Sequence, residues 1–277
     1  MVDTIGSGNS RVALVTGAAQ GVGAAIAESL AISGYAVLLT DVAAREDVLA
    51  SRVAQLSSRG ANSAAAVADV RSQADLDQAV AKAIERFGSL TTVIANAGYG
   101  VGAPFWELTE DQWADSLDVT LTGAWRTAKA AAPALLRASG AALVFVGSTA
   151  GVRANGGFAS YVAAKHGLVG LMRAVALELA PHGVRANAVL LGTVDTPGTR
   201  EPAQWRRVTG LDKPSRDDYL HAVARMHALP GAAPMAADRV ADAVAWLASD
   251  ASAYTTGATI PVDAGRLLLP GMQSNPH

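Results

Sequence analysis

Residues 11–30 read RVALVTGAAQGVGAAIAESL, so an apolar run, a glycine-rich turn and an Ala-rich stretch follow one another directly. The apolar run predicts a strand over Arg11–Thr16, and the Ala-rich stretch predicts a helix near 22–33. Glycines at such a junction let the chain turn sharply and let a phosphate group approach the backbone, while the helix N-terminus offers free N–H groups. The order of strand, glycine turn and helix favours a nucleotide-binding α/β fold over a simple tight connection.

The rest of the chain continues this alternation, which is typical of βαβ units around a parallel sheet. Strands are predicted at residues 11–16, 36–40, 63–68, 91–95, 141–146, 185–190 and 259–262. Helices are predicted near residues 22–33, 46–59, 72–87, 109–138, 160–180, 216–227 and 238–249. We therefore expect a doubly wound Rossmann fold with a seven-stranded parallel sheet and helices on both faces. No repeat or linker interrupts the chain, so residues 1–277 are predicted to form a single Rossmann-type domain with its core at about 11–265.

Composition excludes several classes of function. The 277 residues are 51% hydrophobic and only 17% charged, and the net charge of −2 leaves no basic surplus for binding nucleic acid. The absence of cysteine excludes disulfides, a thiolate nucleophile and a Cys-ligated zinc. No stretch has the pattern of a signal peptide or a bilayer span. We expect a cytoplasmic protein with no metal site, no nucleic-acid partner and no membrane partner.

The residue after the second predicted strand bears on the choice of cofactor. Asp41 stands where a carboxylate accepts hydrogen bonds from the adenosine ribose hydroxyls and repels a 2′-phosphate. Gln20 stands in the glycine turn at a position that could have carried a basic residue to bind a 2′-phosphate. The first basic residue after Asp41 is Arg45. NAD is therefore predicted rather than NADP, although a solvated or helix-capping Asp41 is the alternative.

Further motifs appear in a fixed order, and with them the chain resembles the short-chain dehydrogenase/reductase family, in its single-domain branch, over about residues 11–265. Thr16–Gly23 is similar to that family's TGxxxGxG turn, and Asn96-Ala97-Gly98 to its NAG motif. The resemblance implies catalytic roles for Ser148, Tyr161 and Lys165. It also implies that Tyr161, Lys165 and the following residues bind the cofactor: Gly17, Gln20, Gly21, Val22, Gly23, Asp41, Asp69, Val70, Asn96, Ala97, Gly98, Gly192, Val194 and Thr196.

The spacing of the catalytic residues has a physical meaning of its own. Tyr161 and Lys165 lie four apart, so on a helix they share a face and the ammonium sits near the phenol. A neighbouring positive charge lowers the phenol pKa, and Tyr161 then exchanges a proton with the substrate oxygen. Ser148, at the end of the fifth predicted strand, is expected to hydrogen-bond the same oxygen.

One family position departs from the pattern. The segment 118–123 reads DVTLTG, and it places Thr120 where the family usually carries an asparagine that holds a water of the proton relay. A threonine hydroxyl binds water but lacks the separate donor and acceptor of an amide. We include Thr120 among the catalytic residues and expect proton delivery to be slower or differently routed.

These residues predict an NAD-dependent oxidoreductase that interconverts a secondary alcohol and a ketone by hydride transfer, with Tyr161 as the acid/base. A nucleotide-sugar epimerase or dehydratase shares the Tyr-x-x-x-Lys pattern, but no sizeable substrate domain follows here. A cofactor-binding regulator with weakened catalysis is the other alternative, motivated by Thr120.

Residues 193–235, which we call the insertion, interrupt the regular alternation and are expected to form a lid over the substrate, with a solvated loop as the alternative. The insertion is loosely similar to loops of actinobacterial family members that act on cyclic terpenoid alcohols such as carveol. Many of those members carry an extra segment after the second strand and hold NAD without exchange. This chain lacks that segment, so exchangeable NAD is expected, and hydroxysteroid, diol and β-ketoacyl substrates stay open.

The family resemblance also implies a homotetramer that pairs through two long helices, here 117–137 and 161–180. Small residues along them allow close backbone approach: Ala128, Ala131, Ala132, Gly167, Gly170 and Ala174. The same residues suit plain packing against the sheet, which leaves the assembly open on sequence grounds.

Overall fold

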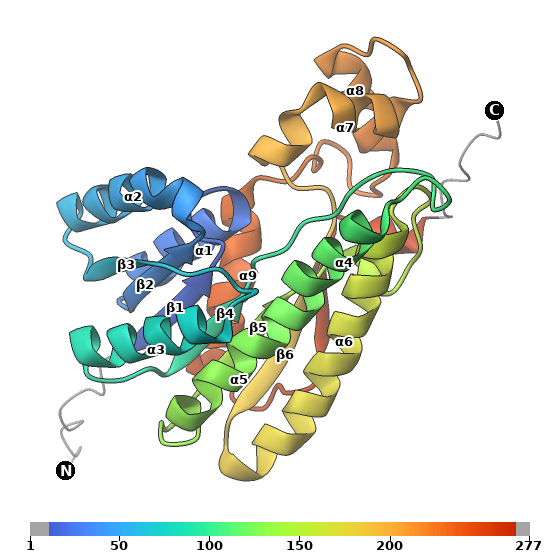
Figure 1. The fold of residues 1–277 in the computed structure, drawn as a ribbon. Coiled ribbons are helices and arrows are strands. Elements are labelled where there is room, and N and C mark those ends of the chain that lie inside the picture. The colour runs from blue at the N-terminus through green and yellow to red at the C-terminus, as the bar shows by residue number, and fades with distance from the viewer. Residues whose placement is uncertain (1–10, 270–277) are drawn as a thin grey trace.

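A computed structural model describes residues 11–269 and contains one seven-stranded parallel sheet in the order β3-β2-β1-β4-β5-β6-β7 (Figure 1). The strands are β1 Val12–Thr16, β2 Ala36–Asp41, β3 Ser63–Val67, β4 Thr92–Ala95, β5 Ala142–Val146, β6 Arg185–Leu191 and β7 Thr259–Val262. Every predicted strand is present within one residue of its expected bounds. The predicted doubly wound Rossmann fold is confirmed, and of the single predicted domain residues 1–10 and 270–277 lie outside the described range.

Helices cover both faces of the sheet, which explains why its central strands are uninterrupted apolar runs rather than alternating ones. The helices are α1 Gly21–Ile32, α2 Glu46–Ser58, α3 Gln73–Phe87, α4 Glu110–Leu117, α5 Gly123–Leu135, α6 Ala159–Leu179, α7 Pro202–Thr209, α8 Arg216–Arg225 and α9 Ala237–Ala248. One apolar core joins one face of the sheet to α3, α5 and α6, and a second core joins the other face to α1, α2 and α9. The side chains of β1 alternate between the two cores, with Leu14 in the first and Val15 in the second.

The helix predicted at 109–138 runs from Glu110 to Leu135, with a π-helical turn at Asp118–Thr122 between α4 and α5. Such a turn accommodates one extra residue and is frequent at functional sites. Here it carries the fully buried Thr120, whose hydroxyl donates to the carbonyl of Tyr99 at 2.9 Å and accepts the Tyr99 N–H at 3.2 Å. The hydrogen bonds fasten the loop after β4 to the helix.

The order of strands fixes where a ligand binds. β1 pairs with β2 on one side and with β4 on the other, so the chain reverses direction across the sheet between β1 and β4. Ligands of open α/β sheets bind at such a switch point, outside the carboxyl ends of the strands. The loops that follow β1, β2, β4 and β5 all reach this edge.

The insertion stands above the same edge as α7 and α8, drawn in orange in Figure 1. Its two ends are paired, because the Asp195 N–H donates to the Met235 carbonyl and the Met235 N–H to the Thr193 carbonyl, both at 2.8 Å. Trp205 stacks on the buried Tyr219 with ring centroids 6.1 Å apart, which gives the insertion a small core of its own. None of the helices within residues 11–269 has both the length and the apolar character needed to cross a membrane.

Candidate active site

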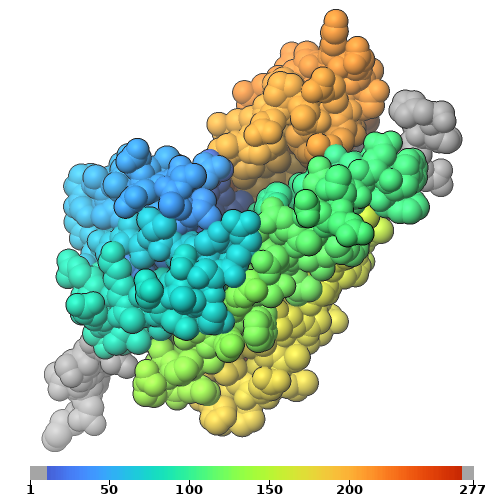
Figure 2. All heavy atoms as spheres, in the orientation of Figure 1, coloured from blue at the N-terminus to red at the C-terminus, as the bar shows by residue number. Residues whose placement is uncertain are grey.

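A cleft of about 1260 Å³ runs along the carboxyl ends of the strands, from the glycine turn to the insertion. Figure 2 shows the surface hollowed where the blue, green and orange parts of the chain meet. Ligand pockets usually measure about 300–1,000 Å³, so the cleft has room for a dinucleotide and a second molecule. Every predicted site residue except Thr120 lines it.

The glycine turn leaves no space for side chains at its inner face. Gly17 has a φ of +65°, a conformation that L side chains rarely adopt. A Cβ at Gly23 would lie 2.1 Å from the carbonyl oxygen of Gly17 and 2.5 Å from the Asn96 amide nitrogen. The backbone is therefore open toward the cleft at the start of α1, where no side chain caps the helix. Such a cradle fits a pyrophosphate.

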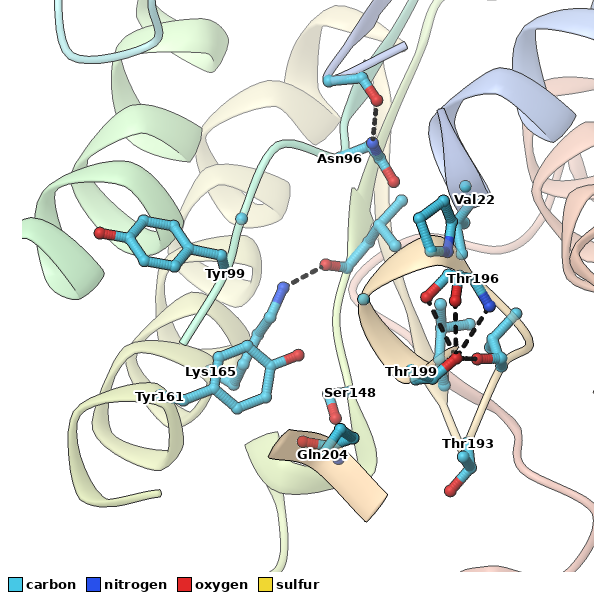
Figure 3. A pocket seen from close by; sticks show the side chains of 18 of the residues that line it. Val22, Asn96, Tyr99, Ser148, Tyr161, Lys165, Thr193, Thr196, Thr199 and Gln204 are labelled. Atoms are coloured by element: carbon cyan, nitrogen blue, oxygen red, sulfur yellow. Dashed lines mark hydrogen bonds between the residues drawn. The ribbon is translucent and has the colours of Figure 1, made fainter. Parts of the chain in front are cut away.

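Asn96 holds this cradle from the neighbouring strand. Its side-chain amide donates to the Thr16 carbonyl at 2.8 Å and to the Gly17 carbonyl at 3.1 Å (Figure 3). The Thr16 hydroxyl in return accepts the N–H groups of Asn96 at 3.1 Å and Ala97 at 3.2 Å. Asn96 thus positions the glycine turn, a role that the NAG motif alone does not reveal.

Asp41 ends β2 and lines the cleft next to the glycine turn. Its carboxylate accepts the Ala19 N–H at 3.0 Å and the Val42 N–H at 2.9 Å, so it also braces the glycine turn. Arg45 lines the same end and donates to the Gln20 side chain at 2.8 Å. The structure therefore places a cation beside Asp41 that the sequence separated by four positions.

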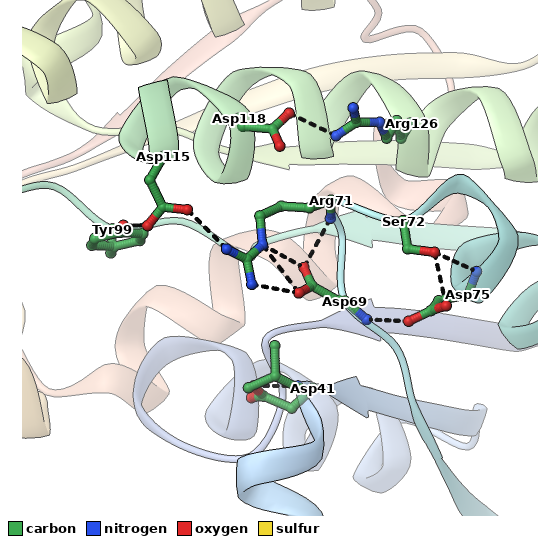
Figure 4. A network of polar contacts seen from close by, with 10 residues as sticks. Asp41, Asp69, Arg71, Ser72, Asp75, Tyr99, Asp115, Asp118 and Arg126 are labelled. Atoms are coloured by element: carbon green, nitrogen blue, oxygen red, sulfur yellow. Dashed lines mark hydrogen bonds and ion pairs between the residues drawn. The ribbon is translucent and has the colours of Figure 1, made fainter. Parts of the chain in front are cut away.

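A polar network next to Asp41 closes the side of the cleft (Figure 4). Arg71 joins Asp69 at 2.7 Å to Asp115 of α4 at 2.9 Å, and the Tyr99 hydroxyl also bonds to Asp115. The hydrogen bond from Arg71 holds the pKa of Asp69 below its usual value. Sequence reasoning missed Arg71, Tyr99 and Asp115, although Arg71 directly follows the predicted pair Asp69-Val70.

The three predicted catalytic side chains meet in the middle of the cleft (Figure 3). Ser148 follows β5, and its hydroxyl caps the next turn by accepting the Ala150 N–H at 3.1 Å. Tyr161 and the buried Lys165 share one face of α6, with the ammonium 5.6 Å from the centre of the phenol ring. Lys165 also donates to the Val146 carbonyl at 2.7 Å, which fixes its position at the end of β5.

Burial dominates the protonation of this group. It raises the pKa of the Tyr161 phenol, and the hydrogen bond with Ser148 opposes that rise. Burial also lowers the pKa of Lys165 to about 8. We expected the Lys165 ammonium to lower the phenol pKa, but burial, the largest cause, raises it in this structure. The neutral phenol is suited to donate a proton.

Thr120 lies outside the cleft but close to it. A Cβ at Gly98 would lie 3.3 Å from the Thr120 hydroxyl and 3.5 Å from the Lys165 ammonium, so both groups flank Gly98. Because the hydroxyl bonds to both backbone groups of Tyr99, it positions the cleft wall.

We predict that Thr120→Asn keeps the activity and the fold, because an amide offers a donor and an acceptor to Tyr99. Thr120→Val keeps the shape of the side chain but leaves the N–H and the carbonyl of Tyr99 without their hydrogen-bond partner. A buried group left unpaired in this way costs about 1–3 kcal/mol. Thermal unfolding and kcat/KM of the two variants test this. A Thr120→Val enzyme as stable and active as the unmodified protein would contradict the positioning role.

This arrangement, a glycine cradle for a pyrophosphate beside a buried Ser, Tyr and Lys group, defines a dinucleotide-dependent oxidoreductase. The family model described as enoyl-(acyl carrier protein) reductase matches residues 17–266. The chain belongs to this family of short-chain dehydrogenases/reductases.

Relatives of similar length match nearly the whole chain. The chain is 38% identical over 272 residues to (-)-trans-carveol dehydrogenase of Rhodococcus erythropolis, covering 93% of this chain and 98% of that protein. It is 36% identical over 274 residues to an uncharacterized NAD-dependent oxidoreductase of Mycobacterium tuberculosis, covering 95% and 98%. The solved structure of carveol dehydrogenase from Mycobacterium avium in complex with NAD matches with a TM-score of 0.88 and 36% identity, covering 94% and 98%.

Proposed function

We propose that this protein interconverts a secondary alcohol and a ketone, with NAD as the hydride acceptor or donor. The observation that carries the proposal is the convergence of Ser148, Tyr161 and Lys165 on the cleft that the glycine cradle opens into. This intact group argues against a regulator without catalysis. The absence of a second domain within residues 11–269 argues against a nucleotide-sugar epimerase.

The protein's own groups manage the substrate oxygen. Ser148 donates a hydrogen bond to the carbonyl oxygen and stabilises the charge that develops on it. Tyr161 gives its phenolic proton to that oxygen in reduction and removes the proton from the alcohol in oxidation. Lys165 holds its ammonium next to the phenol and stabilises the phenolate that remains. NAD, when bound, carries the hydride to or from the substrate carbon.

The residues around the cradle suit NAD. Asp41 presents its carboxylate at the adenosine end of the cleft, and the relatives described above include an NAD-dependent enzyme and a complex with NAD. We therefore predict that kcat/KM with NAD exceeds that with NADP about tenfold or more, or about 1.4 kcal/mol. Asp41→Asn should narrow this preference, because it removes the charge and leaves Arg45 to attract a 2′-phosphate. Steady-state kinetics with both cofactors measures it.

Two further variants sharpen the cofactor experiment. Asp47→Asn removes an exposed charge at the start of α2 and should leave the preference unchanged. In the double variant Asp41→Asn/Arg45→Gln, kcat/KM with NADP should fall back to its value before the Asp41→Asn change. A native enzyme that prefers NADPH would show that Asp41 has been misread.

The insertion is proposed to close over the bound substrate. Leu211 and Met226 line the cleft, whereas Trp205 and Tyr219 pack against each other and do not line it. We predict that NADH with an unreactive substrate analogue slows hydrogen exchange in residues 193–235 by about tenfold, because closure protects the backbone. Mass spectrometry of the exchanged peptides measures this, with α3 as the unaffected control. Equal exchange in the insertion in both states would refute the lid.

The substrate is proposed to be a cyclic secondary alcohol, since two of the relatives described above are carveol dehydrogenases. A panel of cyclic, steroidal and acyclic secondary alcohols, assayed by NAD reduction, tests the proposed function directly. No turnover of any member would reject it. We also propose a homotetramer in the cytoplasm, paired through α5 and α6, and light scattering at several concentrations tests the assembly.

A further inference from the structure

The substrate end of the cleft contains a charge that the proposed reaction does not use. Arg266 follows β7 and lines the cleft together with the insertion residues Leu211 and Met226. Its Nη1 nitrogen is buried and has no hydrogen-bond partner. The structure gives Arg266 no ion pair with any residue in the range 11–269.

The carboxylate of Asp263, three positions before Arg266, is already hydrogen-bonded to the backbone. Asp263 accepts the Gly265 N–H at 2.9 Å through one oxygen and the Leu267 N–H at 2.8 Å through the other, which shapes the turn after β7. Arg153 donates to the Arg266 carbonyl at 2.8 Å, which brings a second arginine against the same turn. Burial, the largest cause, and the charge of Arg153 lower the pKa of Arg266, while the charge of Asp263 opposes them to a smaller extent. A buried cation in such surroundings is unstable unless an anion joins it.

Arg266 belongs to the substrate side of the site. The hydrogen bond from Arg153 connects it to the turn that begins at Ser148, five positions earlier in the chain. The acidic residues that line the cleft are Asp41, Asp69 and Asp115, and all three lie at the adenosine end. No carboxylate among the described residues therefore lines the cleft near Arg266.

A second arginine faces the same space. Arg207 of α7 lines the cleft, packs its guanidinium over the Phe158 ring at 5.5 Å and donates to the Gln204 side chain at 3.1 Å. A Cβ at Gly102 would lie 2.3 Å from its Nε, so the guanidinium also rests on the loop after β4. Arg207 adds positive potential at the opening of the cleft, whereas Arg266 lies deeper in the cleft.

We propose that the substrate is a hydroxy acid or keto acid, whose carboxylate binds to Arg266 while its alcohol or ketone carbon lies at Ser148 and Tyr161. The planar fork of a guanidinium matches a carboxylate with two parallel hydrogen bonds, and a single negative charge balances the single buried cation. The apolar Leu211 and Met226 then cover the carbon skeleton between the two ends. This assignment rests on the proposed alcohol and ketone chemistry and narrows its substrate class.

The experiment compares two ketones of the same shape, 4-oxocyclohexane-1-carboxylate and its carboxamide, reduced with NADH. We expect kcat/KM for the carboxylate to be about tenfold higher, as for a charge-assisted pair against a neutral one. In Arg266→Gln this advantage should vanish through a higher KM at similar kcat, while the carboxamide is unaffected. Arg206→Gln, an exposed arginine of the same charge on α7 that does not line the cleft, is the matched control and should keep the advantage.

A second measurement uses only the native protein, in case Arg266→Gln does not fold. Cyclohexanecarboxylate should inhibit the reduction of a neutral cyclic ketone about tenfold more tightly than cyclohexanecarboxamide, competitively with the ketone. Equal inhibition, equal kcat/KM for the two ketones, or an Arg266→Gln variant that slows both ketones alike would overturn the inference. If neutral ketones are reduced without any preference for the acid, only this inference fails. If no ketone is reduced at all, the proposed function fails with it.

Discussion

Tyr161→Phe is expected to lower kcat about a thousandfold or more, because it removes the group that exchanges a proton with the substrate oxygen. The Tyr161 hydroxyl is buried and hydrogen-bonded with Ser148, whereas the hydroxyl of Tyr99, which also lines the cleft, is bonded to Asp115. NADH affinity, measured by its fluorescence on binding, should stay within about twofold, because the phenol acts on the substrate rather than on the nucleotide.

A matched control separates this effect from the loss of any tyrosine hydroxyl. Tyr254 is fully exposed and does not line the cleft, so Tyr254→Phe should keep full activity. A Tyr161→Phe enzyme that retains a tenth of the native kcat would show that another group transfers the proton, and the assignment of the acid/base would then be rejected.

Gly23→Ala is the second change with a large expected effect. The new methyl group would lie 2.1 Å from the Gly17 carbonyl and 2.5 Å from the Asn96 amide, well inside any real contact distance. The glycine turn must then shift, which breaks the hydrogen bond between Asn96 and Gly17 and moves the helix N-terminus away from the pyrophosphate. We expect NADH affinity to fall about a hundredfold, measured by fluorescence titration or calorimetry.

Gly60→Ala controls for general destabilisation. Gly60 also has a positive φ, +80°, but a Cβ there meets nothing within 4 Å, and the residue lies beyond the end of α2. Both variants should lose stability by about 1–2 kcal/mol from backbone strain or crowding, yet only Gly23→Ala should lose NADH. Equal affinity of the two variants for NADH would mean that the glycine turn does not hold the cofactor.

The sheet was predictable because its signals are local. Buried parallel strands are short apolar runs between turn residues, so each of the seven could be placed within one residue of its bounds. The positions predicted for cofactor and catalysis, apart from Thr120, line one cleft, since they follow strand ends or keep the four-residue spacing of a helix face. Physical spacing and family resemblance therefore led to the same positions.

Other features depend on contacts between distant segments, which no local pattern reveals. The π-helical turn at Asp118–Thr122 carries Thr120, whose hydrogen bonds reach Tyr99, a residue in a different loop. The raised pKa of Tyr161 depends on how deeply α6 packs, whereas the sequence showed only the nearby Lys165. Arg266 carried no signal at all, because its importance comes from the partner that it lacks in the folded chain.

The pairing at the base of the insertion also matters for how such an enzyme changes its substrate. Val194 and Met235 lie side by side as a short parallel bridge, so forty intervening residues leave the domain and return to it at one point. Within this stretch Thr196 lies beside Gly21, and His227, Ala228 and Leu229 bond to Thr193 and Ala264, so both ends of the stretch help to hold the frame. The helices α7 and α8 lie between these contacts, and exchanging them alone is a route to new specificity that leaves the chemistry intact.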